Sequence, residues 1–142
     1  MDNRRVLLYH KQATSARTLF LDHAHGSVLA PGPLPALSSV AEEDDERGLS
    51  GLLPHPAALL KELSGELGLA MGLLEIDAEF RVLVDTPPGP VAVYLAHFTT
   101  MDPPRALMGE KGASFLPLTA LRGRHPAEME LLRRAYASIL GG

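Results

Sequence analysis

Short segments rich in β-branched and other apolar residues, some with apolar and polar positions in alternation, predict the β-strands of this chain. They span 4–12, 16–23, 78–86 and 90–100, and a shorter apolar segment at 114–121 indicates one more strand and a turn. In 16–23, for example, Leu19 and Leu21 alternate with their neighbours. The connections Ala-Thr-Ser and Pro-Pro-Gly are short, so the first two strands and the next two are each expected to form a hairpin.

Two other segments carry apolar residues three and four positions apart, the spacing of an amphipathic α-helix. In 55–68 the apolar stripe consists of Leu59, Leu60, Leu63 and Leu67, and in 125–140 it consists of Met129, Leu132, Tyr136, Ile139 and Leu140. Both segments begin with His-Pro-Ala, and proline suits the first position of a helix. Gly68 is placed to end the first helix in a left-handed conformation. These helix starts indicate that His55 and His125 cap helices rather than take part in catalysis.

The remaining segments are expected to be loops. In 26–40, three prolines and two glycines exclude a regular element, and 101–113 is also expected to be a loop. The five consecutive acidic residues 42–46 form either a solvated loop or a loop that attracts a metal ion. Strands and helices are thus mixed along the chain without a long linker, which predicts a single α/β or α+β domain, 1–142, with a mixed sheet.

Composition narrows the range of partners and compartments. Apolar residues make up 46% and charged residues 21% of the chain, which is ordinary for a soluble globular protein. The net charge of −4 argues against nucleic acid as a partner, because nucleic-acid-binding surfaces are usually basic. Cysteine is absent, which fits a reducing cytoplasm. No apolar run approaches the roughly 20 residues that span a bilayer, and the run Val6 to Leu8 is too short for a signal peptide. We therefore expect a cytoplasmic protein with no nucleic-acid or membrane partner.

The end of the first predicted helix, KELSGELGL at 61–69, resembles the signature of the Nudix hydrolase superfamily. That signature reads G, five residues, E, seven residues, then R-E-U-x-E-E-x-G-U, where U is a bulky aliphatic residue. Glu62 and Glu66 match two of its glutamates, Gly68 matches the closing glycine, and Lys61 replaces the arginine. The similarity extends over most of the chain in the right order. VLAPGPLPA resembles the family's proline-glycine segment, and SFLPLTAL resembles its aromatic-x-Pro-Leu segment before the last helix.

The sequence departs from this signature at three positions. Gly65 stands where the family has the first of two paired glutamates, Leu53 stands at the upstream glutamate, and Arg47 stands at the first glycine, with Gly48 next to it. Glycine costs about 1 kcal/mol relative to alanine inside a helix, so its presence needs a reason. Gly65 marks a decayed metal site, or it lets a ligand or another backbone approach closely, or the segment is an ordinary amphipathic helix with solvated glutamates.

The resemblance implies a Nudix-like α/β/α sandwich with a central mixed β-sheet and the two main helices predicted above. Family members cleave a nucleoside diphosphate linked to another moiety, by metal-assisted attack of water on a phosphoanhydride, with Mg²⁺ or Mn²⁺ as cofactor. Carboxylates suit Mg²⁺, which prefers oxygen ligands. By this resemblance Glu62 and Glu66 are catalytic residues and metal ligands, and Lys61 orients the helix or a glutamate. Glu110 is either a replacement metal ligand or a solvated loop residue.

Other candidate sites are weaker. Asp22, His23 and His25 have the composition of a metal site, because two histidines two positions apart in a strand share one face. The alternative is a pair of surface histidines at the end of a strand. The sequence contains neither the Gly-x-Ser-x-Gly of a hydrolase elbow nor a phosphate-binding G-x-x-x-x-G-K-[ST] loop.

Three functions are compatible with these features. The first is a Nudix-fold protein with an incomplete metal site and weak or no pyrophosphohydrolase activity, which binds a nucleotide-like small ligand or a protein partner. The second is an active, divergent Mg²⁺-dependent Nudix hydrolase. The third is a non-catalytic structural or oligomerisation domain. The resemblance also carries the expectation of a homodimer.

Overall fold

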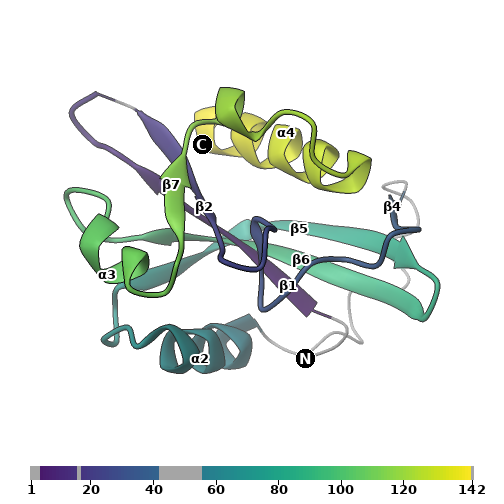
Figure 1. Cartoon of the computed structure of the whole chain (residues 1–142), viewed down its shortest axis with the longest axis horizontal. Coiled ribbons are helices and arrows are strands. Elements are labelled where there is room, and N and C mark those ends of the chain that lie inside the picture. The colour runs from purple at the N-terminus through teal and green to yellow at the C-terminus, as the bar shows by residue number, and fades with distance from the viewer. Residues whose placement is uncertain (1–3, 16, 42–55, 142) are drawn as a thin grey trace.

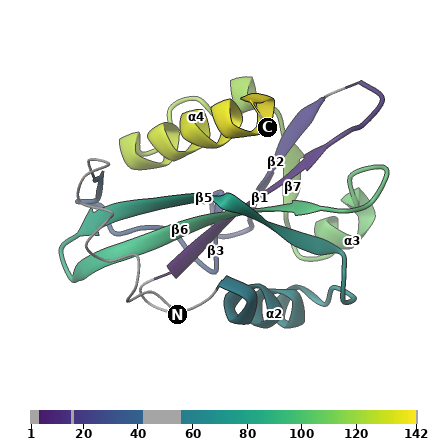
Figure 2. The same ribbon diagram turned by 180° about the vertical axis from the view of Figure 1, so that it is seen from behind.

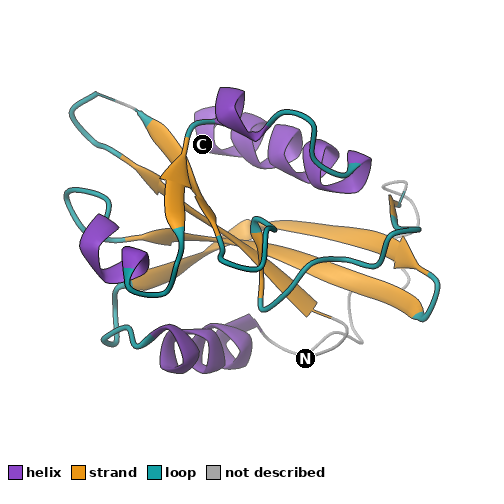
Figure 3. Ribbon diagram, in the orientation of Figure 1, coloured by secondary structure: helices purple, strands orange, loops and turns teal. Residues whose placement is uncertain are grey.

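The computed structural model describes residues 4–15, 17–41 and 56–141 of the chain (Figure 1). Among these residues a seven-stranded sheet is combined with three α-helices and a 3₁₀ helix (Figure 3). In chain order the elements are β1 (Arg4–Lys11), β2 (Thr18–Asp22), β3 (Leu29–Ala30), β4 (Ser39–Val40), α2 (Pro56–Leu67), β5 (Leu74–Thr86), β6 (Gly89–Phe98), α3 (Arg105–Gly109), β7 (Ser114–Leu116), η1 (Leu118–Leu121) and α4 (Pro126–Gly141).

The sheet is mixed and curled, with strand order β4-β5-β6-β1-β2-β7 and β3 paired to β1 (Figure 1). The pairs β1–β2 and β5–β6 are antiparallel, which confirms the two predicted hairpins. The central pair β1–β6 is parallel and places Tyr9 opposite His97. This pairing joins the two hairpins into one sheet.

Two helices cover opposite faces of the sheet, α2 on one side and α4 on the other (Figure 2). Successive side chains of a strand point to opposite faces. In β1, Val6 and Leu8 accordingly pack in the cluster under α2, whereas Leu7 and Tyr9 pack in the cluster under α4. All four are buried, so β1 is a central strand with no face open to solvent. The mixed α/β class predicted from the sequence is confirmed.

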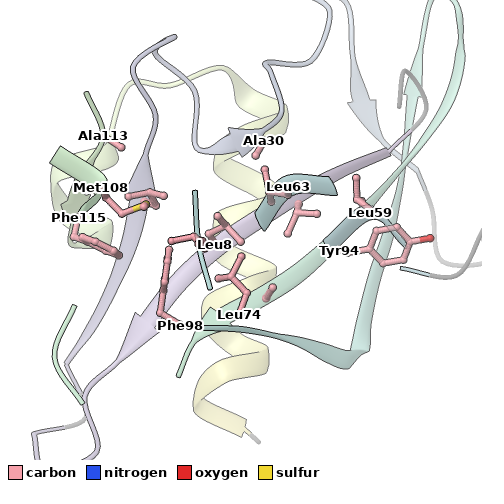
Figure 4. Packing of buried hydrophobic residues seen from close by; sticks show 14 of the residues in the cluster. Leu8, Ala30, Leu59, Leu63, Leu74, Tyr94, Phe98, Met108, Ala113 and Phe115 are labelled. Carbon is pink, nitrogen blue, oxygen red and sulfur yellow. The ribbon is translucent and has the colours of Figure 1, made fainter. Parts of the chain in front are cut away.

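The predicted helices 55–68 and 125–140 correspond closely to α2 and α4. In α2 the buried residues are Leu59 and Leu63, as the stripe predicts, and they face the sheet with Leu8 and Leu74 nearby (Figure 4). In α4 the stripe was wrong at one end. Leu140 is 56% exposed, and Leu131 and Ala135 are buried instead, because α4 is rotated slightly relative to the predicted stripe.

Two predicted loops contain regular structure. The prediction of no regular element in 26–40 was wrong, since β3 and β4 lie there, each only two residues long. Prolines lack the N–H that a sheet requires, which keeps such strands short. The segment 101–113 contains the five-residue helix α3, which starts after Pro104. The predicted strand 78–86 begins earlier, at Leu74. The acidic run 42–46 lies outside the described residues.

Candidate functional site

Helix α2 presents Glu62 and Glu66 to solvent. Its Leu59 and Leu63 are buried against the sheet, whereas Glu62 and Glu66 are exposed. Residues four apart on a helix lie on the same face. The sheet therefore fixes the orientation of α2, and the two carboxylates point away from the core side by side.

The end of α2 is fixed by a glycine, as predicted. Gly68 has a φ of 68°, in the left-handed region that favours glycine. The N–H of Leu69 donates to the carbonyl of Ser64 at 2.8 Å, and the N–H of Gly68 donates to the carbonyl of Gly65 at 3.3 Å. These two bonds form the Schellman motif that closes many helices. The last turn that carries Glu66 is thus well defined.

Gly65 lies in this last turn, between the two glutamates on the helix surface. It is exposed, and a Cβ added there would meet no atom within 4 Å apart from its chain neighbours and the surrounding helix backbone. Close approach of another part of the described backbone therefore does not explain this glycine. A side chain can therefore begin at this position without a clash of its Cβ.

A pocket of about 460 Å³ opens beside Gly65. Most of the residues that line it are apolar or glycine: Ala57, Leu60, Gly65, Leu69, Met71, Gly72 and Leu74. Lys61 and Ser64 add polar groups at α2, and Lys61 is the charged residue among the described lining residues. A pocket with apolar walls and a few polar groups is typical of a small-molecule site.

The loop with Glu110 reaches the end of α2. The Cε and Nζ atoms of Lys111 lie 4.0 Å from the position that a Cβ on Gly68 would take. Glu110 itself is exposed. Within the described ranges, however, no group of three His, Cys, Asp or Glu side chains is close enough to hold a metal ion. The structure thus places the Glu110 loop near the helix but does not bring Glu62, Glu66 and Glu110 together as a three-ligand set.

The candidate group Asp22, His23 and His25 has other contacts. Asp22 is paired with Arg124 at 2.7 Å, and the His23 and His25 rings stack with centroids 5.1 Å apart. Burial, followed by the neighbouring His25, lowers the pKa of His23 to about 4. His23 is buried, so its interpretation as a surface histidine was wrong. Arg124, in the segment before α4, donates hydrogen bonds to Asp22 Oδ1 and to the carbonyl of Gly26, both at 2.7 Å.

The capping role predicted for His125 is confirmed. The N–H of Ala127 donates to His125 Nδ1 at 3.1 Å, at the start of α4. In the same turn Glu128 is buried and accepts hydrogen bonds from Ser27 Oγ at 2.9 Å and from the N–H of Val28 at 3.4 Å. The other histidine of this type, His55, lies outside the described residues.

A polar cluster that the sequence did not predict lies on the α4 side of the sheet. Tyr9 Oη donates to Asp77 Oδ2 at 2.5 Å, and His97 Nδ1 lies 2.6 Å from Asp77 Oδ1. Burial, and then the hydrogen bond to Asp77, raises the pKa of the Tyr9 hydroxyl. The hydrogen bond to Asp77 also raises the pKa of His97. The three residues are far apart in the sequence, so only the strand pairing reveals them.

Comparison with known proteins adds no relative. No family model matches the chain, and no curated protein is significantly similar to it. In the described part of the chain, no helix is both long and apolar enough to cross a membrane. Function is therefore argued from the residues themselves.

Proposed function

We propose that this protein is a Nudix-like α/β/α sandwich with an incomplete metal site on α2, and that it binds a nucleotide-like small ligand with weak or no pyrophosphohydrolase activity. The observation that carries this proposal is Gly65. It is exposed on α2 next to two exposed glutamates, Glu62 and Glu66, at a position where an added Cβ meets no clash and where the resembled signature has a glutamate.

The carboxylates on α2 supply only part of a metal site. Glu62 and Glu66 are oxygen donors on one helix face, which suits Mg²⁺ or Mn²⁺. The described residues do not add a third donor, so the set expected from the family resemblance is not complete and we derive no catalytic step from it. Binding of a divalent ion by only two carboxylates would depend strongly on further oxygen ligands from the phosphates of a bound ligand. Protein Mg²⁺ sites commonly consist of one or two carboxylates together with substrate phosphates.

The pocket beside Gly65 suits the remainder of such a ligand. Its apolar walls, about 460 Å³ in volume, would take a nucleobase or another apolar body. Lys61 lines the same pocket and would attract a phosphate as a point charge. Gly65 lines this pocket and lies next to Glu66 in the chain and three residues after Glu62. Binding would thus use the position at which the carboxylate is missing.

An active hydrolase is the second candidate, and one observation favours it. The end of the Lys111 side chain reaches the end of α2 at Gly68, and Glu110 is the preceding residue in the chain. In this alternative Glu62, Glu66 and Glu110 would hold Mg²⁺ or Mn²⁺, and Lys61 would orient a glutamate. The ion would supply charge neutralisation on the phosphoanhydride.

Hydrolysis of a panel of nucleoside diphosphate derivatives, with and without Mg²⁺ and Mn²⁺, separates these possibilities. The matched variant is the double change Glu62→Gln and Glu66→Gln, which keeps size and removes charge. We expect little or no turnover, together with thermal stabilisation of the protein by at least one ligand of the panel. Metal-dependent turnover that the double variant loses would establish the hydrolase instead. If the folded protein shows neither turnover nor stabilisation by any ligand of the panel, both proposals fail. The structural or oligomerisation domain is then the remaining function.

A further inference from the structure

The walls of the pocket beside Gly65 are aliphatic. The apolar side chains that line it are Ala57, Leu60, Leu69, Met71 and Leu74. Among the described lining residues there is no aromatic ring, no carboxylate and no amide side chain. Protein sites that recognise a nucleobase commonly stack it on an aromatic ring and form hydrogen bonds with its polar edges. This pocket offers no ring for stacking, so a base would depend on the few polar groups around it.

Three backbone carbonyls of the lining residues already accept hydrogen bonds. Those of Ser64 and Gly65 accept from N–H groups at the end of α2, at 2.8 Å and 3.3 Å. The carbonyl of Gly72 accepts from Thr99 Oγ1 at 2.6 Å. A nucleobase in this pocket would lose water from its polar edges and find few new partners, which opposes binding. An alkyl chain has no polar atoms to satisfy and gains affinity from burial of its methylene groups.

The polar side chains of the pocket lie together on α2. Lys61 and Ser64 are three residues apart, so they are neighbours on the helix surface. Neither side chain has a hydrogen-bond or ion-pair partner among the described residues. The Lys61 ammonium and the Ser64 hydroxyl can therefore both donate to a ligand. Because Lys61 is the charged residue of the described lining, charge favours an anionic group at this side of the pocket.

We propose that the nucleotide-like ligand of this site is an aliphatic diphosphate, with an alkyl or isoprenoid chain in place of the nucleoside. The chain lies against Leu60, Met71 and Leu74, and the diphosphate accepts hydrogen bonds from Lys61 and Ser64. The volume of about 460 Å³ is in the range of small-ligand sites. The diphosphate end rests on the metal site proposed above for the glutamates of α2, whereas the aliphatic end rests on the pocket walls alone.

The test compares diphosphates that differ only in the attached group. Calorimetry with the full chain and Mg²⁺ gives the Kd of butyl, hexyl and octyl diphosphate, of ADP, and of inorganic pyrophosphate as the diphosphate alone. Each methylene that leaves water is worth up to about fourfold in affinity. Octyl diphosphate should therefore bind at least about tenfold more tightly than either butyl diphosphate or ADP. A Kd that does not fall with chain length, or ADP binding as tight as that of octyl diphosphate, would overturn the aliphatic ligand.

Two exposed methionines provide a matched pair of variants. Met71 lines the pocket and is 99% exposed, whereas Met101 is 85% exposed and does not line it, so neither change removes a core side chain. Met71→Ser should weaken octyl diphosphate about threefold or more and leave inorganic pyrophosphate unchanged, because it removes only apolar contact. Met101→Ser should leave both unchanged. Lys61→Met should weaken all the diphosphates alike and keep the gain with chain length. An equal effect of the two methionine changes on octyl diphosphate would contradict a chain bound in this pocket.

The double change Glu62→Gln and Glu66→Gln separates the aliphatic ligand from the metal site. In this variant the dependence of binding on Mg²⁺ should be lost, whereas the gain from butyl to octyl diphosphate should persist. If the wild type shows that gain but no effect of Mg²⁺, the metal site fails and the aliphatic ligand stands. If ADP and pyrophosphate bind with Mg²⁺ and affinity does not rise along the alkyl series, the aliphatic ligand fails and the metal site stands.

Discussion

Replacing Gly65 by alanine should stabilise the protein. Gly65 is in a helix, it is exposed, and its added Cβ meets no atom within 4 Å apart from its chain neighbours and the surrounding helix backbone. Alanine therefore gains helix propensity without a steric cost. In a helix interior this is worth about 0.5–1 kcal/mol, and the position in the last turn of α2 favours the lower part of that range. For a chain of 142 residues the unfolding entropy near the midpoint converts this gain to an increase in Tm of about 2–3 °C.

Urea denaturation and calorimetry measure this effect, and Gly68→Ala is the matched control. Gly68 lies three residues later but has a φ of 68°, so alanine there should destabilise by about 1 kcal/mol or more. The urea midpoint should move up for Gly65→Ala and down for Gly68→Ala with an unchanged m-value. Destabilisation by Gly65→Ala would refute the reasoning, because it would mean that another group fills the space over this glycine.

Three further predictions concern stability. Leu63→Ala should cost about 2–5 kcal/mol in chemical denaturation, because Leu63 is 2% exposed under α2; a loss below 1 kcal/mol would mean that α2 does not pack as described. Glu128→Ala should cost about 1–3 kcal/mol in the same assay, because it leaves the buried Ser27 hydroxyl and the N–H of Val28 without their acceptor; an unchanged denaturation midpoint would contradict this network. The pKa of His23 is lowered from 6.5 to about 4, so its contribution to stability is present above pH 6.5 and is lost as the pH falls towards 4. Denaturation midpoints between pH 7 and 4 should show this loss, and His23→Asn should flatten it.

Local periodicity explains which parts of the fold were predictable. The apolar spacing in α2 predicted that Leu59 and Leu63 face the core, and Gly68 predicted where the helix ends. The apolar spacing and the helix-ending glycine both depend only on residues within a few positions of one another in the sequence. The stripe on α4 was less accurate, because the helix is rotated slightly from the predicted stripe, which exposes Leu140 and buries Leu131 and Ala135.

The strand pairings account for what the sequence did not predict. Tyr9 and Asp77 are 68 positions apart and meet only because β1 pairs in parallel with β6 and because β5 is irregular at Asp77. No local pattern contains that information. The glutamates on α2 were found because their spacing is local. Whether they hold a metal ion depends on contacts that local spacing does not determine.

Mn²⁺ affinity is the most direct test of the incomplete metal site that we propose on α2. It is measured by calorimetry for the wild type, Gly65→Glu and Gly65→Gln, where glutamine has the size of glutamate without its charge. A unit charge about 4 Å from a divalent ion contributes about 2 kcal/mol even in water, so Gly65→Glu should bind Mn²⁺ at least about tenfold more tightly than the wild type. Gly65→Gln should not, and the gain should vanish when Glu62 and Glu66 are changed to glutamine. Equal Mn²⁺ affinity in the wild type and Gly65→Glu would contradict an incomplete metal site on α2.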